Sequence, residues 1–184
     1  LLFYSVLGFT QILPGVSINY WARDELHLSP STTGVATSMI SLPWILKPIV
    51  GFLSDCVPIF GYRRKSYLVL ASFGASAMWM LLAAVPAAVW STMLLGIATQ
   101  LCIVTADVVA DGLVVHYVHK NEHDIQNKGK MQSATWTCRF GGSIVASFLS
   151  GFVLEFVPPR AVFGMTAMPL FVMGCFSMGY AEER

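Results

Sequence analysis

Charged side chains are scarce in this sequence. Only 11% of its 184 residues are Asp, Glu, Lys or Arg, whereas soluble domains carry about 25%. The 11 basic and 10 acidic residues nearly cancel, so the chain has no strong net charge that would attract nucleic acid. A hydrophobic fraction of 55% excludes intrinsic disorder, which requires few apolar residues and a high net charge. The composition therefore argues against a soluble enzyme and against a nucleic-acid-binding protein.

Motifs for metal ions and disulfides are also missing. The four cysteines, Cys56, Cys102, Cys138 and Cys175, stand alone, without a CxxC pair or a histidine-rich tract. Structural zinc sites and disulfide frameworks depend on such spacings. We therefore expect no metal ion and no cofactor, and we expect the cysteines to serve as small buried hydrophobic residues.

Long runs without any charge take up most of the chain. No Asp, Glu, Lys or Arg occurs in Leu1–Ala22, Leu26–Leu46, Ser66–Ala106 or Ala161–Ala181. A helix needs about 20 mostly apolar residues to cross a bilayer, so three runs fit one span each, and the longest fits two with a break at Pro86. With a sixth span around Arg139, the predicted spans are residues 1–22, 32–54, 66–86, 90–116, 132–155 and 161–181. The predicted fold is an all-α membrane protein with six transmembrane helices.

The distribution of Lys and Arg predicts the orientation, because short cytoplasmic loops carry more basic residues than external ones. Six basic residues lie in the loops after the second and fourth spans, at positions 63, 64, 65, 120, 128 and 130. The opposite side has only Arg23 and Arg160. We therefore place both basic loops and both chain ends in the cytoplasm.

Aromatic residues near the ends of spans are typical anchors at the membrane surface. Trp21, Tyr67 and Trp90 occupy such positions in the predicted spans. We expect all three side chains to lie at the interface between lipid and water.

Four ionisable residues fall inside the predicted spans: Lys47, Asp107, Asp111 and Arg139. A charge inside the membrane costs roughly 2.5–3.5 kcal/mol on insertion scales and usually belongs to a pathway or a paired network. From the rise of a helix, all four lie at a similar depth near the cytoplasmic side, and the two aspartates share one helix face. Two interpretations stay open: a structural salt-bridge cluster, or a substrate or proton pathway lined by the same side chains.

The segment between the second and third spans carries a motif. It reads Lys-Pro-Ile-Val-Gly-Phe-Leu-Ser-Asp over residues 47–55 and continues to a Gly-Tyr-Arg-Arg-Lys run at residues 61–65. This pattern resembles the loop signature of the major facilitator superfamily. The resemblance implies a latch in which an aspartate pairs with a basic run and breaks during switching, while glycines allow close packing and a tight turn. The residues of this predicted latch are Gly51, Asp55, Gly61, Arg63, Arg64 and Lys65.

Three stretches resemble the folate–biopterin transporter family within that superfamily. They are the segment that begins at Lys47, the sequence Asp107-Val-Val-Ala-Asp111-Gly-Leu-Val-Val, and Gln132-Ser-Ala-Thr-Trp136 with Arg139. The resemblance implies that residues 1–184 form the N-terminal six-helix half of a transporter with about twelve helices, whose C-terminal half is absent from this chain. It further implies ion-coupled transport of folate, biopterin or a related pteridine by alternating access.

Pteridine chemistry agrees with these charges. The aminopyrimidinone edge can hydrogen-bond a carboxylate such as Asp107 or Asp111, and the glutamate carboxylates of folates suit Arg139 or Lys47. Trp136 lies near Arg139 and could stack on a planar ligand, although core packing also explains it. The expected partners are the small-molecule solute, the lipid bilayer and a second six-helix half, without nucleic acid.

Other functions stay open at this point. An intramembrane enzyme would use Asp107 and Asp111 as a metal–diphosphate site, but the sequence has no second acidic cluster of the kind such enzymes need. The chain could also belong to a major facilitator transporter of another small organic solute. A third alternative is a six-helix protein that acts alone, or an inactive half-length fragment.

Overall fold

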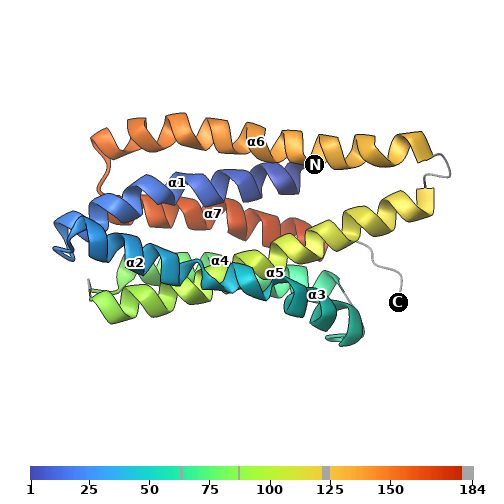
Figure 1. The fold of residues 1–184 in the computed structure, drawn as a ribbon, viewed down its shortest axis with the longest axis horizontal. Helices are drawn as coiled ribbons and strands as arrows, with labels where there is room; N and C mark the ends of the chain where they lie inside the picture. The colour runs from blue at the N-terminus through green and yellow to red at the C-terminus, as the bar shows by residue number, and fades with distance from the viewer. Residues whose placement is uncertain (63, 87, 122–124, 180–184) are drawn as a thin grey trace.

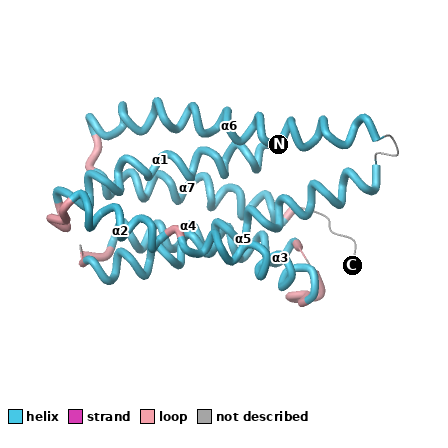
Figure 2. Tube along the Cα trace, in the orientation of Figure 1, coloured by secondary structure: helices cyan, strands magenta, loops and turns pink. Residues whose placement is uncertain are grey.

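The computed structural model describes residues 1–62, 64–86, 88–121 and 125–179. Helices account for nearly all of these residues, and the described ranges contain no strand beyond an isolated bridge between Ile59 and Tyr62. In chain order the segments are α1 (Leu2–Asp24), α2 (Pro30–Ile40), the 3₁₀ helix η1 (Leu42–Leu46), α3 (Lys47–Cys56), α4 (Lys65–Ala84), α5 (Val89–Asn121), α6 (Ile125–Phe156) and α7 (Pro159–Met178). They form an elongated bundle (Figure 1), and short loops join them (Figure 2).

Most of these helices are suited to a membrane. Five segments are long and apolar enough to cross one: Pro30–Cys56, Lys65–Ala84, Val89–Val118, Gly129–Phe156 and Pro159–Met178. α1 is not among them, although it has 23 residues, because polar residues such as Gln11 and Asn19 interrupt its apolar run. The structure confirms the predicted class, an all-α membrane protein. The break expected at Pro86 falls between α4 and α5.

The second predicted span, residues 32–54, is not an uninterrupted helix. The 3₁₀ helix η1 (Leu42–Leu46) separates α2 from α3. Pro43 and Pro48 explain this interruption, because proline has no N–H to donate and its ring clashes with the preceding turn of an α-helix. The interruption lies directly before Lys47, whose side chain reaches α5.

α5 and α6 are longer than the predicted spans 90–116 and 132–155. They have 33 and 32 residues, because α5 continues to Asn121 and α6 begins at Ile125. At 1.5 Å per residue each helix is about 50 Å long, whereas the hydrocarbon core of a bilayer is about 30 Å thick. α5 extends past the end of its predicted span and α6 begins before its predicted span, because hydropathy marks the limits of an apolar run and not those of a helix. Figure 1 shows the two helices projecting together past the rest of the bundle.

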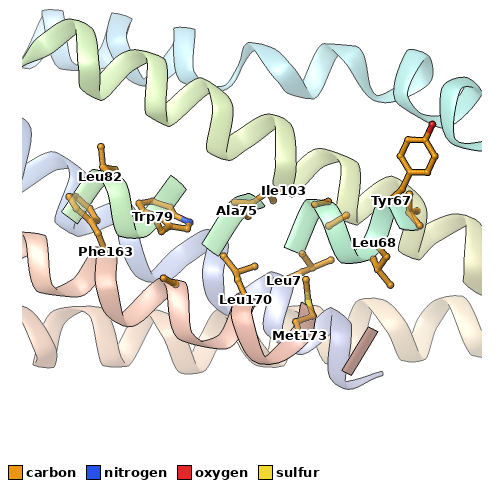
Figure 3. Packing of buried hydrophobic residues seen from close by; sticks show 14 of the residues in the cluster. Leu7, Tyr67, Leu68, Ala75, Trp79, Leu82, Ile103, Phe163, Leu170 and Met173 are labelled. Carbon is orange, nitrogen blue, oxygen red and sulfur yellow. The ribbon is translucent and has the colours of Figure 1, made fainter. Parts of the chain in front are cut away.

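The hydrophobic core lies where α1, α4, α5 and α7 meet. One buried cluster joins these helices and includes Leu7, Trp79, Ile103, Phe163 and Leu170 (Figure 3). The rings of Trp79 and Phe163 stack with their centroids 5.5 Å apart. Such aromatic pairs contribute about 0.5–1.5 kcal/mol beyond the burial of their surface, and in lipid this close packing is what holds helices together.

Some expectations about individual side chains are wrong. Trp21 and Tyr67, predicted as interface anchors, are only 1% and 8% exposed and belong to the core. Trp90 is 78% exposed, and its place at the membrane surface stays a prediction. Cys56 and Cys175, predicted to be buried, are exposed. The reason is the same in each case: position along a span does not determine which face of the helix a residue occupies.

α1 and α6 lie side by side and run in the same direction (Figure 1). They approach most closely at two glycines. A Cβ atom added at Gly8 would lie 2.1 Å from the carbonyl oxygen of Arg139, and one added at Gly142 would lie 2.1 Å from that of Ser5. Glycine is therefore required at both positions, and the contact fixes the backbone of Arg139 against α1.

Candidate functional site

A fully buried carboxylate lies at the centre of the charged residues. Asp107, in α5, is 0% exposed. Arg139 of α6 donates from Nη1 to its Oδ1 at 2.5 Å, and Nζ of Lys47 lies 2.5 Å from its Oδ2. The Lys47 contact is an ion pair and not a well-aligned hydrogen bond, since Oδ2 accepts none. A carboxylate this deeply buried requires such pairing, because an isolated charge away from water is far more costly.

These three residues, Lys47, Asp107 and Arg139, form what we call the charged triad. They come from α3, α5 and α6, which the sequence separates by tens of residues. The triad carries two positive charges and one negative charge, so its net charge is +1. It is therefore suited to attract an anion.

Arg139 is held on three sides within the bundle. Its Nη2 donates to Oε1 of Gln11 on α1 at 2.9 Å. Its guanidinium lies 5.4 Å from the ring centre of Trp136, one turn earlier on α6. The guanidinium is thus almost completely enclosed, with 11% of the side chain exposed, whereas Trp136 is 45% exposed and presents an open aromatic surface beside it.

Lys47 is the more accessible cation of the triad. Its side chain is 34% exposed, and its ammonium lies 4.9 Å from the ring centre of Trp44 in η1. The indole of Trp44 donates from Nε1 to Oε1 of Gln100 on α5 at 3.2 Å. A second aromatic ring is therefore fixed beside the second cation.

Asp111 lies one helical turn from Asp107 but does not join the triad. Its Oδ1 accepts a hydrogen bond from the hydroxyl of Tyr4 on α1 at 2.7 Å. Within the described ranges it forms no ion pair with a lysine or arginine. The structure thus brings three of the four predicted membrane charges together and places the fourth beside a neutral partner.

Arg64 connects the predicted latch to α5. Its Nη2 lies 3.1 Å from Oδ1 of Asp55, at the end of α3, and its Nη1 donates to the carbonyl oxygen of Gly112 at 2.7 Å. Gly112 directly follows Asp111 in α5. A single guanidinium therefore ties the turn between α3 and α4 to the helix that carries both membrane aspartates.

The other predicted latch residues shape this turn or lie beside it. Phe60 and Gly61 have positive φ values of 53° and 80°, the signs of a type I′ turn, in which glycine is favoured. At Gly51 an added Cβ would lie 3.4 Å from a Val108 methyl group, an ordinary contact, so the packing of α3 on α5 does not require glycine there. The ammonium of Lys65 lies 5.5 Å from the ring centre of Tyr62, and Arg63 lies outside the described residues.

Sequence reasoning missed four polar residues of this site: Tyr4, Gln11, Trp44 and Gln100. Gln11 and Gln100 carried a usable signal, because an amide in an otherwise apolar span is costly unless it finds a partner. Trp44 and Tyr4 carried no such signal, since aromatic residues are common throughout this chain.

Several transporters are similar to this chain. It is 38% identical to the folate-biopterin transporter of Synechocystis over 92% of its length, and 30% identical to a probable folate-biopterin transporter 4 of Arabidopsis thaliana over 88%. It is 32% identical to a putative folate transporter 2 of Plasmodium berghei over 87%. The chain spans about a third of the length of these relatives, with shares of 33%, 33% and 35%. A family model described as the BT1 family matches residues 7–184, and the chain therefore belongs to the BT1 family.

Proposed function

We propose that this chain forms the N-terminal six-helix half of a secondary transporter that moves folate, biopterin or a related pteridine by alternating access. The observation that carries the proposal is the charged triad, buried among helices that are suited to a membrane. Ionisable residues inside membrane segments mark substrate and ion pathways more often than they serve stability alone. The names of the relatives supply the substrate class, since they are folate or folate-biopterin transporters.

The substrate would bind at the open side of the triad. Lys47, the accessible cation, would meet a substrate carboxylate, as P-loop and other anion sites use lysine as a point charge. Trp44 and Trp136 provide aromatic surfaces on which a flat pteridine ring can stack. The Asp107 carboxylate keeps the two cations in place rather than contacting the substrate, because both of its oxygens already face a cation.

A second six-helix half would cover the site. Apolar side chains project from α6 away from its contact with α1, among them Phe140, Ile144, Phe148 and Phe152, which are 58% to 81% exposed. Such a face fits either lipid or another helix bundle. Binding between two halves, near the middle of the membrane, is the usual arrangement in secondary transporters. We place both ends of the chain in the cytoplasm.

Uptake of labelled substrate tests this function directly. The full-length protein that contains this chain would be reconstituted in liposomes and supplied with folate, biopterin or an unrelated hexose. We expect uptake of at least one pteridine, competition by the unlabelled compound and no uptake of the hexose. Arg139→Gln should abolish uptake, whereas the matched control Arg160→Gln, which breaks a partly exposed pair with Glu25 at the other end of the bundle, should retain it. Transport of the hexose alone, or equal activity in both variants, would contradict the proposal.

A further inference from the structure

The positive and negative charges of the four ionisable residues in the membrane segments cancel only when all four are counted. Lys47 and Arg139 contribute two positive charges, and Asp107 and Asp111 contribute two negative charges. Asp107 is shared by both cations, so the charge of Asp111 balances the +1 of the triad from one turn away. The two aspartates look equivalent in the sequence but differ in the structure. Asp107 pairs with both cations, and Asp111 balances the positive charge that remains.

We propose that Asp111 is a proton-binding site that couples proton uptake to the binding of a carboxylate-bearing substrate at the charged triad. This inference rests on the proposed transport function. It goes further in two respects. It names a proton as the ligand of Asp111, and it names a negative charge as the feature of the substrate that makes this proton necessary.

Charge balance gives the reason for the coupling. When an anionic group binds the triad while Asp111 is ionised, the site gains a net charge of −1 inside the membrane, where charge is costly. A proton taken from the water on the loading side converts the Asp111 carboxylate to the neutral acid and restores a net charge of zero. Release of the anion on the other side reverses the balance, so that the same proton leaves Asp111 and no other group changes its charge.

The surroundings of Asp111 favour this role over the same role for Asp107. From α1, the Tyr4 hydroxyl donates to Asp111, and a neutral hydroxyl can also accept a hydrogen bond from the protonated acid. From the turn before α4, Arg64 contacts the neighbouring Gly112 carbonyl. Along α5 the next carboxylate is Asp107, whose charge is already matched by Lys47 of α3 and Arg139 of α6.

The other elements near Tyr4 present uncharged side chains, nearly all of them apolar. The cavity beside Tyr4, with a volume of about 390 Å³, is lined from α4 by Leu68, from α5 by Ala110 and Leu113, and from α7 by Met173 and Ser177. Among these described lining residues none carries a charge. Protonation of Asp111 therefore changes the balance of the charged site without breaking an ion pair.

Two transport modes of the full-length protein in liposomes separate proton coupling from substrate binding. Net accumulation of labelled folate under an inward proton gradient requires the coupling, whereas exchange of external for internal folate at equal pH requires only substrate binding and movement. We expect Asp111→Asn to lose gradient-driven accumulation and to retain exchange. Asp107→Asn should lose both modes, because it leaves two cations unpaired. Glu155→Gln, a carboxylate near the far end of α6, serves as the matched control and should retain both.

A milder variant measures the titration itself. Tyr4→Phe removes the hydroxyl that stabilises the ionised Asp111 carboxylate and leaves the carboxylate in place. The pH at which folate uptake falls to half should move upward, because the ionised carboxylate loses a hydrogen-bond donor. A purely structural role of Tyr4 would lower the uptake rate without moving the pH profile, and that result would overturn the inference.

The substrates provide a further distinction. Biopterin has no carboxylate, so its uptake should depend on the proton gradient far less than that of folate. If the wild-type protein moves neither pteridine, the proposed function fails and the inference fails with it. If the wild-type protein transports folate but Asp111→Asn still accumulates folate when driven by the proton gradient, the inference alone is wrong. The same holds if uptake of biopterin depends on the proton gradient as strongly as uptake of folate does.

Discussion

Asp107 is a single carboxylate that neutralises two cations, and this makes the triad asymmetric. Removal of one cation leaves a matched pair of opposite charges. Removal of the carboxylate leaves two positive charges close together in a buried site, where neither has a counter-ion. Because an unpaired buried charge is much more costly than a missing pair, the three residues should differ sharply in their response to neutral substitutions.

We predict that Asp107→Asn destabilises the protein more than Arg139→Gln, and that Arg139→Gln destabilises it more than Lys47→Gln. The loss for Asp107→Asn should be about 3–5 kcal/mol, the range for a broken buried pair. Lys47 is the more exposed of the two cations, so solvent screens its contribution to stability more than that of Arg139. Thermal unfolding of the three variants in detergent measures the order. Equal losses in all three would show that the triad does not share its charges in this way.

At the scale of the helices, the contact between α1 and α6 depends on two glycines. At Gly8 and Gly142 the backbone of one helix touches the backbone of the other with no room for a side chain. This contact also determines the site, since it holds Arg139 at the height of Gln11. The positions therefore link helix packing directly to the geometry of the triad.

We predict that Gly8→Ala and Gly142→Ala each cost about 1–3 kcal/mol, the usual range for overpacking, and that each displaces Arg139 from Asp107. Both helices offer a matched control, since a Cβ at Gly15 or Gly141 would meet nothing within 4 Å. Gly15→Ala and Gly141→Ala should therefore leave thermal stability in detergent unchanged. If all four variants lose the same stability, the contact between α1 and α6 is not the cause, since alanine is the better helix former at each of these positions.

Sequence patterns predicted the helical class and four candidate charges, because both depend on where charges interrupt apolar runs, and the structure brings three of the four together. The 3₁₀ helix η1 was not predicted, since two prolines in an apolar span are also compatible with a plain kink. The separation of Asp111 from the charged triad was not predictable either. Its distance from the cations depends on the rotation of α3 and α6 about their axes, and a single charge in each helix does not report that rotation.

At the scale of the whole molecule, the distribution of basic residues implies one orientation in the bilayer. The turn at Phe60 and the segment at Ser31 lie at opposite ends of the α2–η1–α3 unit. Phe60 is 83% exposed and Ser31 is also exposed. These two positions are therefore accessible reporters for the two sides of the membrane.

We predict that a cysteine at Phe60 faces the cytoplasm and a cysteine at Ser31 faces the opposite side. Phe60→Cys and Ser31→Cys would be made in a background without the four native cysteines, because Cys56 and Cys175 are exposed. A membrane-impermeant maleimide applied to intact cells that carry the protein in the plasma membrane should label Ser31→Cys at once and Phe60→Cys only after permeabilisation. The reverse pattern would invert the orientation.

The interruption at η1 has a mechanical consequence. A 3₁₀ helix turns by about 120° per residue and an α-helix by about 100°. Over the five residues of η1 the difference amounts to about 100° of rotation and, at 0.5 Å per residue, about 2.5 Å of length. Rewinding η1 as an α-helix would therefore swing Lys47 about a quarter of a turn around the axis and away from Asp107. The same five residues set the winding of the segment and thereby hold the triad together.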